Sequence, residues 1–159
     1  MKTIMVSLTF VLATHLAASN TPPIEKGCDI PGNNLRSSKE KSAESCANIC
    51  GKDDKCKGFT FISGWNKCFL KTRVKTKAKV TMIAAHKNAA FKLHHDHDNS
   101  GKDFKNVPLD SAELCIEECR KSSKCQGFSY IKGYRSCWLK KTQGRIFPKV
   151  FYCGAKKSS

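Results

Sequence analysis

Acidic residues are scarce in this chain: 13 Asp and Glu stand against 29 Lys and Arg among 159 residues, and the acids are scattered. No motif frames a serine, histidine or cysteine as a catalytic nucleophile, so we expect a binding protein without a cofactor rather than an enzyme. Cys-x2-Cys pairs are absent, which argues against a zinc site, and we expect no bound metal. The Asn-x-Ser/Thr acceptor of N-glycosylation is absent as well.

Long hydrophobic runs are missing beyond the first 19 residues. Lys2, the apolar run Ile4 to Ala17 and the small residues that follow have the form of a secretory signal peptide, which we expect to be removed at residue 19. The run is shorter than the roughly 20 residues that span a bilayer, so no membrane span is expected. We expect a secreted protein, with residues 20–27 as a short N-terminal segment or propeptide and 156–159 as a basic tail.

Cysteine, in contrast, is abundant, and eight of the ten cysteines follow one pattern that occurs twice. Cys46-x3-Cys50-x5-Cys56-x11-Cys68 recurs 69 residues later as Cys115-x3-Cys119-x5-Cys125-x11-Cys137. Neighbouring residues repeat too, such as Gly58-Phe59 and Gly127-Phe128. The chain is therefore predicted to contain two copies of one small disulfide-stapled module, at 28–88 and 89–155. So many cysteines also fit an oxidising export route.

Each copy predicts one helix followed by a hairpin. Asp110 to Glu113 has the form of a helix start, with Asp110 as the N-cap, and cysteines four apart then project from one helix face. The alternating segment 127–131, a turn at 132–135 and the segment 136–140 predict the hairpin. The expected fold class is α+β, with each module made of one helix packed on a small antiparallel sheet.

Four cysteines allow three pairings, and the nested one fits this geometry best. It gives Cys46–Cys68 and Cys50–Cys56 in copy one, and Cys115–Cys137 and Cys119–Cys125 in copy two. Cys28 and Cys153 remain, because His97 and Ile83 occupy their places in the other copy. A Cys28–Cys153 bond that joins the two ends of the mature chain is the simplest hypothesis, and a bridge to a second chain is the alternative.

A helix with Cys-x3-Cys, then Cys-x-Gly-Phe, then a hairpin with one more cysteine resembles the PAN/apple module. In that family the core cysteines pair in the nested order, and a further bond often joins the ends of a module. Two basic modules behind a signal peptide also resemble the microneme lectins of apicomplexan parasites. This resemblance implies binding of galactose-terminated or N-acetylgalactosamine-terminated glycans on host cells, after storage in microneme-type secretory organelles. PAN/apple modules also bind proteins and heparin, so a protein-interaction module is an alternative.

A sugar needs an aromatic plate together with fixed hydrogen-bond donors and acceptors. If the cysteine-bearing face of the hairpin meets the helix, Phe128, Tyr130, Trp138 and Lys140 lie on the opposite face, and copy two carries the better sugar site. The candidate carbohydrate-binding residues are Asp103, Lys121, Tyr130, Lys132, Tyr134 and Lys140. The alternative is that the aromatic residues form a second core or a dimer seam. A single shallow site binds weakly, so we expect a homodimer.

The formal net charge is +16, with a dense basic stretch at Lys71, Arg73, Lys75, Lys77 and Lys79. It indicates either a sulfated or otherwise anionic partner or a strand edge kept soluble by lysines, on which Lys75, Lys77 and Lys79 share one face. Nucleic acid is not expected as a partner of an exported protein. The cluster His94-His95-Asp96-His97-Asp98 could bind a metal or respond to pH, but a solvated junction between the modules is the simpler interpretation.

Overall fold

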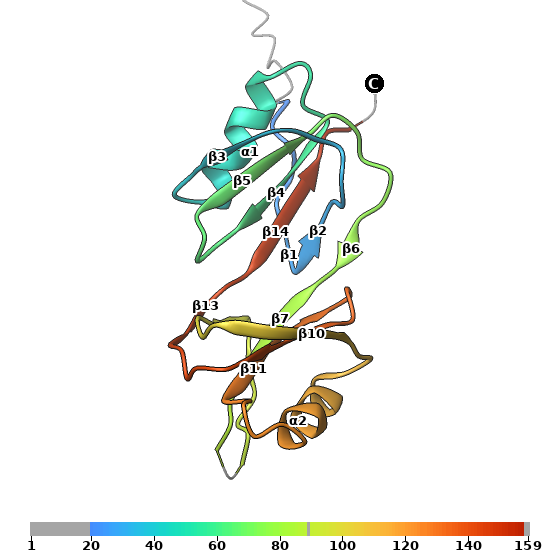
Figure 1. Ribbon diagram of the computed structural model, residues 1–159. Coiled ribbons are helices and arrows are strands. Elements are labelled where there is room, and N and C mark those ends of the chain that lie inside the picture. The colour runs from blue at the N-terminus through green and yellow to red at the C-terminus, as the bar shows by residue number, and fades with distance from the viewer. Residues whose placement is uncertain (1–19, 89, 158–159) are drawn as a thin grey trace, which may run out of the picture.

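The computed structural model describes residues 20–88 and 90–157, so the predicted signal peptide and the last two residues of the predicted tail lie outside the described part. Two antiparallel sheets face each other, and one helix covers the outer side of each (Figure 1). The fold is therefore α+β, with the layer order helix, sheet, sheet, helix. Within residues 20–88 and 90–157, no helix is long and apolar enough to cross a membrane.

The first module consists of α1 (Ala43–Lys52) and a five-stranded sheet in the order β1-β14-β4-β5-β3. The strands are β1 (Glu25–Lys26), β14 (Phe151–Ala155), β4 (Gly58–Ile62), β5 (Lys67–Lys71) and β3 (Asn34–Lys39). A two-stranded ribbon, β2 (Cys28–Asp29) with β6 (Ala78–Lys79), lies beside it. The helix begins at Ser42, whose side chain accepts a hydrogen bond from the Ser45 N–H, as expected of an N-cap.

The second module consists of α2 (Ala112–Arg120) and a sheet in the order β10-β12-β11-β7-β8. The strands are β10 (Asp103–Pro108), β12 (Ser136–Lys140), β11 (Gly127–Lys132), β7 (Thr81–His86) and β8 (His94–His95), with the ribbon β13 (Ile146–Pro148) and β9 (His97–Asn99) beside them. The N-cap of α2 is Ser111, one residue later than the predicted Asp110. Asp110 instead forms an ion pair with Arg135 in the hairpin turn.

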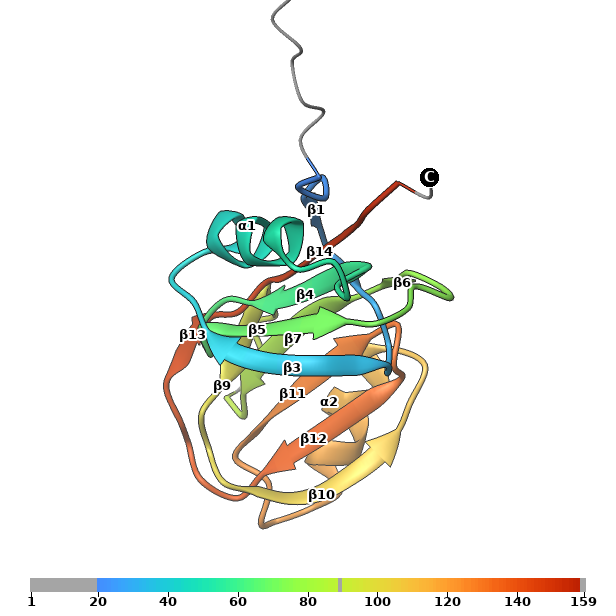
Figure 2. The ribbon, with the colours of Figure 1, turned by 90° about the horizontal axis from the view of Figure 1, so that it is seen from above.

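Each copy of the repeat gives its last strand to the other module. The red strand β14, from the end of copy two, pairs with β4, and the green strand β7, from the end of copy one, pairs with β11 (Figures 1 and 2). The bounds 28–88 and 89–155 therefore follow the sequence repeat but not the sheets. A chain divided at residue 88 separates each sheet from one of its strands.

Strand exchange explains why the two unmatched cysteines belong together. The sulfurs of Cys28 and Cys153 are bonded within one chain, and their Cα atoms lie 5.5 Å apart. Because β14 belongs to the first sheet, this bond closes the first module, while His97 and Ile83 occupy the corresponding places in the second. The other bonds are the nested pairs Cys46–Cys68, Cys50–Cys56, Cys115–Cys137 and Cys119–Cys125. No described cysteine is free, which fits a secreted protein.

The inner faces of the two sheets meet in a seam between the modules. Its apolar part is made of Ile62, Val80, Met82 and Phe151, against which the half-buried Phe69 and Ile131 pack. The hairpin turns cross the seam in both directions: Trp65 of copy one covers the ammonium group of Lys149, and Tyr134 of copy two donates a hydrogen bond to Asp29. The two modules are thus interlocked.

A buried ion pair forms the polar part of the seam. Lys149 Nζ donates to Asp98 at 2.7 Å, and the Ser129 hydroxyl donates to the same carboxylate at 2.5 Å. Burial alone raises the pKa of Asp98, but the bonds from Lys149 and Ser129 outweigh it and hold that pKa below its usual range. Burial lowers the pKa of Lys149, and its bond to Asp98 works in the opposite direction.

We expect Lys149→Met to destabilise the fold by about 3–5 kcal/mol, because it leaves a buried carboxylate without its cation. The double variant Lys149→Met/Asp98→Asn is expected to recover much of that loss, as measured by urea unfolding. The depressed pKa of Asp98 adds stability above its unfolded pKa of about 3.9, and this stability is lost as the pH falls through the folded pKa. The advantage of the wild type over the double variant should therefore shrink below about pH 4; a constant difference between pH 7 and pH 3 would contradict this assignment.

Candidate functional site

Tyr130 and Phe128 lie on the helix side of their sheet, so the prediction that they face away from the helix was wrong. Tyr130 is paired with Cys137, and Phe128 with Leu139, and directly paired residues share one face. Strand alternation counted from Cys125 puts Phe128 and Tyr130 on the face opposite the cysteine. That count fails because Cys125 lies in a turn before the strand, where its N–H donates to the Ser122 carbonyl. Tyr130 is 1% exposed and donates its hydroxyl to the Leu109 carbonyl at 3.0 Å, so it belongs to the core and not to a ligand site.

Of three other predicted site residues, Lys121 lies at the end of α2, and Lys132 and Tyr134 lie in the hairpin. Lys121 ends α2, on the outer side of the molecule, and pairs with Glu118 at 3.5 Å. Lys132 is exposed at the end of β11. Tyr134 reaches across the seam to Asp29, and burial together with that bond raises the pKa of its hydroxyl. Lys121 and Tyr134 are thus each bound to a partner within the chain, Glu118 and Asp29.

Asp103 and Lys140, in contrast, do meet, beside an exposed tryptophan. The Lys140 ammonium lies 2.5 Å from Asp103 Oδ1, and these two residues are opposite each other in the register of β10 and β12. Trp138 lies two residues before Lys140 on the same face and is 39% exposed. Asn106 lies opposite Trp138, and its amide nitrogen donates to Ser136 Oγ at 2.8 Å. We call Asp103, Asn106, Trp138 and Lys140 the Trp138 platform.

The platform holds an aromatic plate next to oriented polar groups. Lys140 is almost fully buried, so its bond fixes Asp103 while the second carboxylate oxygen of Asp103 stays available. The Asn106 amide nitrogen is occupied, which leaves its carbonyl oxygen as an acceptor. Below the platform, the Cys115–Cys137 bond ties β12 to α2. The platform is therefore a rigid, shallow surface that can stack an apolar ring face and accept hydrogen bonds.

The corresponding surface of the first module is covered. Phe69 stands in the place of Trp138, but it packs against the seam cluster, and the ammonium groups of Lys67 and Lys71 lie 6.0 and 5.7 Å from its ring centroid. Lys71 is buried and donates to Asn34 at 2.6 Å. Sequence comparison gave Trp138 and Lys140 as a pair but missed Asn106, because a partner on β10 follows only from the strand register.

Lys71, the first residue of the basic stretch, ends β5 and is buried. Beyond it, only Ala78–Lys79 lies in a strand, so the expectation that Lys75, Lys77 and Lys79 line one strand face was wrong. Arg73, Lys75, Lys77 and Lys79 are all exposed, and Lys77 pairs with Glu25. The stretch is thus an exposed basic segment at one side of the first module.

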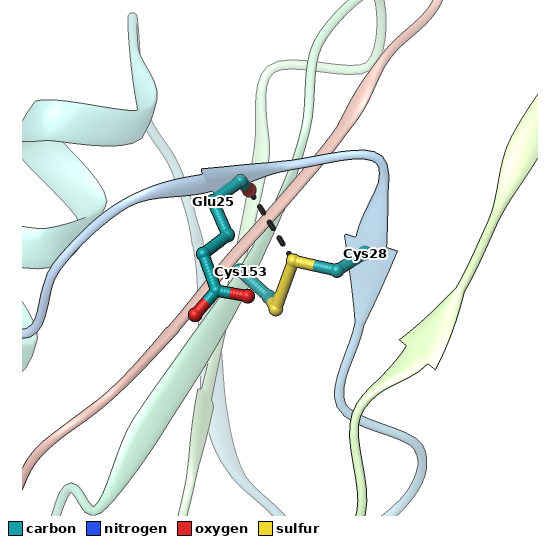
Figure 3. A group of neighbouring side chains, drawn as sticks. All are labelled: Glu25, Cys28 and Cys153. Carbon is teal, nitrogen blue, oxygen red and sulfur yellow. Dashed lines mark hydrogen bonds between the residues drawn. A yellow bond between two sulfur atoms is a disulfide. The ribbon is translucent and has the colours of Figure 1, made fainter.

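The histidine cluster lies between the modules, where Asp96 pairs with Lys26 at 2.7 Å. The rings of His94 and His97 are 5.8 Å apart, and burial together with nearby charges lowers the pKa of His94. Among residues 20–88 and 90–157, the only three ligand-type side chains that converge are Glu25, Cys28 and Cys153 (Figure 3). Two of these form a disulfide, so neither offers a thiolate to a metal ion.

Comparison with known families agrees with this architecture. Models of the PAN domain match residues 26–89 and residues 97–140. The chain therefore belongs to the PAN-domain family and carries two such domains in tandem. PAN domains are binding modules for proteins or carbohydrates. No curated protein matches the chain.

Proposed function

We propose that this protein is a lectin that binds terminal galactose or N-acetylgalactosamine on the Trp138 platform. The supporting observation is the exposed indole of Trp138 beside Asp103 and Asn106. The axial 4-hydroxyl of galactose leaves the C–H groups of carbons 3, 4 and 5 on one face, which stacks well on an indole. Asp103 and Asn106 then accept hydrogen bonds from the sugar hydroxyls, and Lys140 holds Asp103 in place.

The shallow platform also suggests how the lectin acts. A single open site gives weak binding, so firm attachment to host-cell glycans needs at least two sites on one particle. We propose a homodimer for this reason, secreted from microneme-type storage organelles. We also propose that the protein acts by binding alone, without metal or cofactor: its described cysteines are all in disulfides, which leaves no thiol nucleophile among them.

A glycan array with the mature, oxidised protein at low and high salt tests this function. We expect signal on terminal galactose or N-acetylgalactosamine that survives high salt and is lost with free galactose but not with glucose or mannose. Stacking and neutral hydrogen bonds are little affected by ions, whereas exposed charges are screened within about 8 Å at physiological ionic strength.

The exposed basic segment supports a second candidate, the binding of sulfated glycosaminoglycans through Arg73, Lys75, Lys77 and Lys79. It predicts signal only on sulfated glycans, which disappears at high salt. That result would replace the galactose proposal. An array without signal would point to a protein partner.

A further inference from the structure

The first module has an open pocket of about 590 Å³ where the end of α1 meets the edge strand β3. It is lined by Arg36, Ile49, Lys52, Asp53, Asp54 and Lys55. None of these residues belongs to the Trp138 platform, which lies on the second module. We call this hollow the α1 pocket.

The wall of the α1 pocket is held rigidly. Asp53, which ends the helix, accepts from the Arg36 guanidinium and, at 3.0 Å, from the Lys55 N–H. The Cys50–Cys56 disulfide closes the turn that carries these residues, and Lys156 donates to the Asp53 carbonyl at 3.0 Å. A preformed wall reduces the entropy lost when a ligand is bound.

Several charged groups of the pocket have no charged partner. Within residues 20–88 and 90–157, neither Lys52 nor Lys55 forms an ion pair, although both are exposed. The carboxylate of Asp54 also has no ion-pair partner in that part of the chain. Ile49 adds a half-buried apolar surface between these groups. The pocket thus offers two cations, one acceptor and an apolar floor.

In the second module, the lysine that corresponds to Lys52 is paired with an acid of the same module. Glu118 stands there in place of Ile49, and its two oxygens bind Lys105 at 2.8 Å and Lys121 at 3.5 Å. Lys121 is the repeat counterpart of Lys52. Glu118 therefore forms an ion pair with the lysine whose counterpart in the first module has no ion-pair partner among the described residues. The two modules therefore differ here in where the acids stand: copy two has Glu118 in place of Ile49, and Ser122 and Ser123 in place of Asp53 and Asp54.

We propose that the α1 pocket is a second glycan site, which takes an acidic pyranose, a sugar ring with a carboxylate or a sulfate group. The anion is bound by Lys52 and Lys55, Ile49 contacts the apolar face of the ring, and Asp54 accepts from a hydroxyl group. This site goes beyond the proposed galactose site, since it differs in its residues, its module and its ligand. A molecule with both sites would bind a neutral and an acidic sugar on the same cell surface.

The test is a ¹⁵N NMR titration of the full mature protein with methyl β-D-glucuronide, galactose 6-sulfate and methyl β-D-galactoside. We expect an acidic probe to shift the amides of residues 52–55. Ile49→Glu introduces the acid that the second module has at this position and should weaken that binding about tenfold or more, and Lys52→Ala about fivefold. Lys52 is exposed, so its variant keeps the test decisive if Ile49→Glu folds poorly.

The three probes separate the possible outcomes. Binding of the glucuronide supports a carboxylate ligand, and binding of only the 6-sulfate supports a sulfate ligand in the same pocket. If neither probe shifts residues 52–55, or if both variants bind as the wild type does, the proposal is overturned. Failure of the neutral galactoside to bind counts against the Trp138 platform alone.

Discussion

A chain that ends after Lys149, and so lacks β14, is expected to lose the fold of the first module although every residue removed belongs to copy two or to the basic tail. β14 lies between β1 and β4, so β1 loses its only hydrogen-bonding partner and β4 keeps only β5. Burial of Phe151 is worth about 2 kcal/mol. The Cys28–Cys153 bond, with a sequence separation of 125, adds about 5 kcal/mol in the chain-entropy model. A loss of this size approaches the whole stability of a small domain, roughly 5–15 kcal/mol.

Hydrogen exchange resolved by segment is the measurement for this truncation. Protection should disappear in β4 and β5 and persist longest in β11 and β12, whose strand neighbours are all still present. A chain that ends after Lys157 is the matched control, because it keeps β14 and the Lys156 bonds to the end of α1. If the chain ending after Lys149 keeps wild-type protection in β4, the strand exchange is not what holds the first module together.

Trp138→Ala is expected to lower the affinity for galactose by a factor of about 30 or more. The variant removes the aromatic plate of the platform, and such central aromatic residues each contribute about 2 kcal/mol or more to a binding site. Stability should change little, because Trp138 is 39% exposed and lies outside the core of the second module. Calorimetric titration with galactose and thermal unfolding measure the two effects separately.

Leu114→Ala is the matched control for this variant. Leu114 is similarly exposed, at 38%, but lies on α2, on the other side of the sheet. Its removal should leave galactose affinity unchanged. If Trp138→Ala binds galactose as the wild type does, the platform is not the sugar site. Asp103→Asn should cause a smaller loss, since it removes one charged acceptor and keeps the aromatic plate.

The local features of the fold followed from the sequence. Helix-start motifs, cysteines four apart and alternating strands act over a few residues, so both helices and both hairpins could be predicted from the repeat, with the N-cap of α2 one residue off. The nested disulfides follow from the same local geometry. The exchange of β7 and β14 could not be predicted in this way, because each strand alternates equally well in either sheet. Only the unmatched Cys28 and Cys153 indicated it, because a bond between them brings the start of copy one to the end of copy two.

The site was less predictable than the fold, because it depends on which face each side chain takes. One turn at Cys125 reversed the expected face of Tyr130 and moved it from the site to the core. Asp103 and Lys140 were both in the candidate set, but their contact and their neighbour Asn106 follow only from the register of β10 and β12. Phe69 is covered and Trp138 is exposed because only Phe69 packs against the seam cluster. Such packing between modules cannot be predicted from a local sequence pattern.

The most direct test of the sugar site is to follow the two indole N–H signals during a titration with methyl β-D-galactoside. The chain has two tryptophans, so each signal can be assigned with one variant. Trp138 lies on the platform, whereas Trp65 covers Lys149 in the seam. We predict that the Trp138 signal shifts in proportion to bound sugar while the Trp65 signal stays in place. A titration in which the sugar binds but the Trp138 signal does not move would contradict the account.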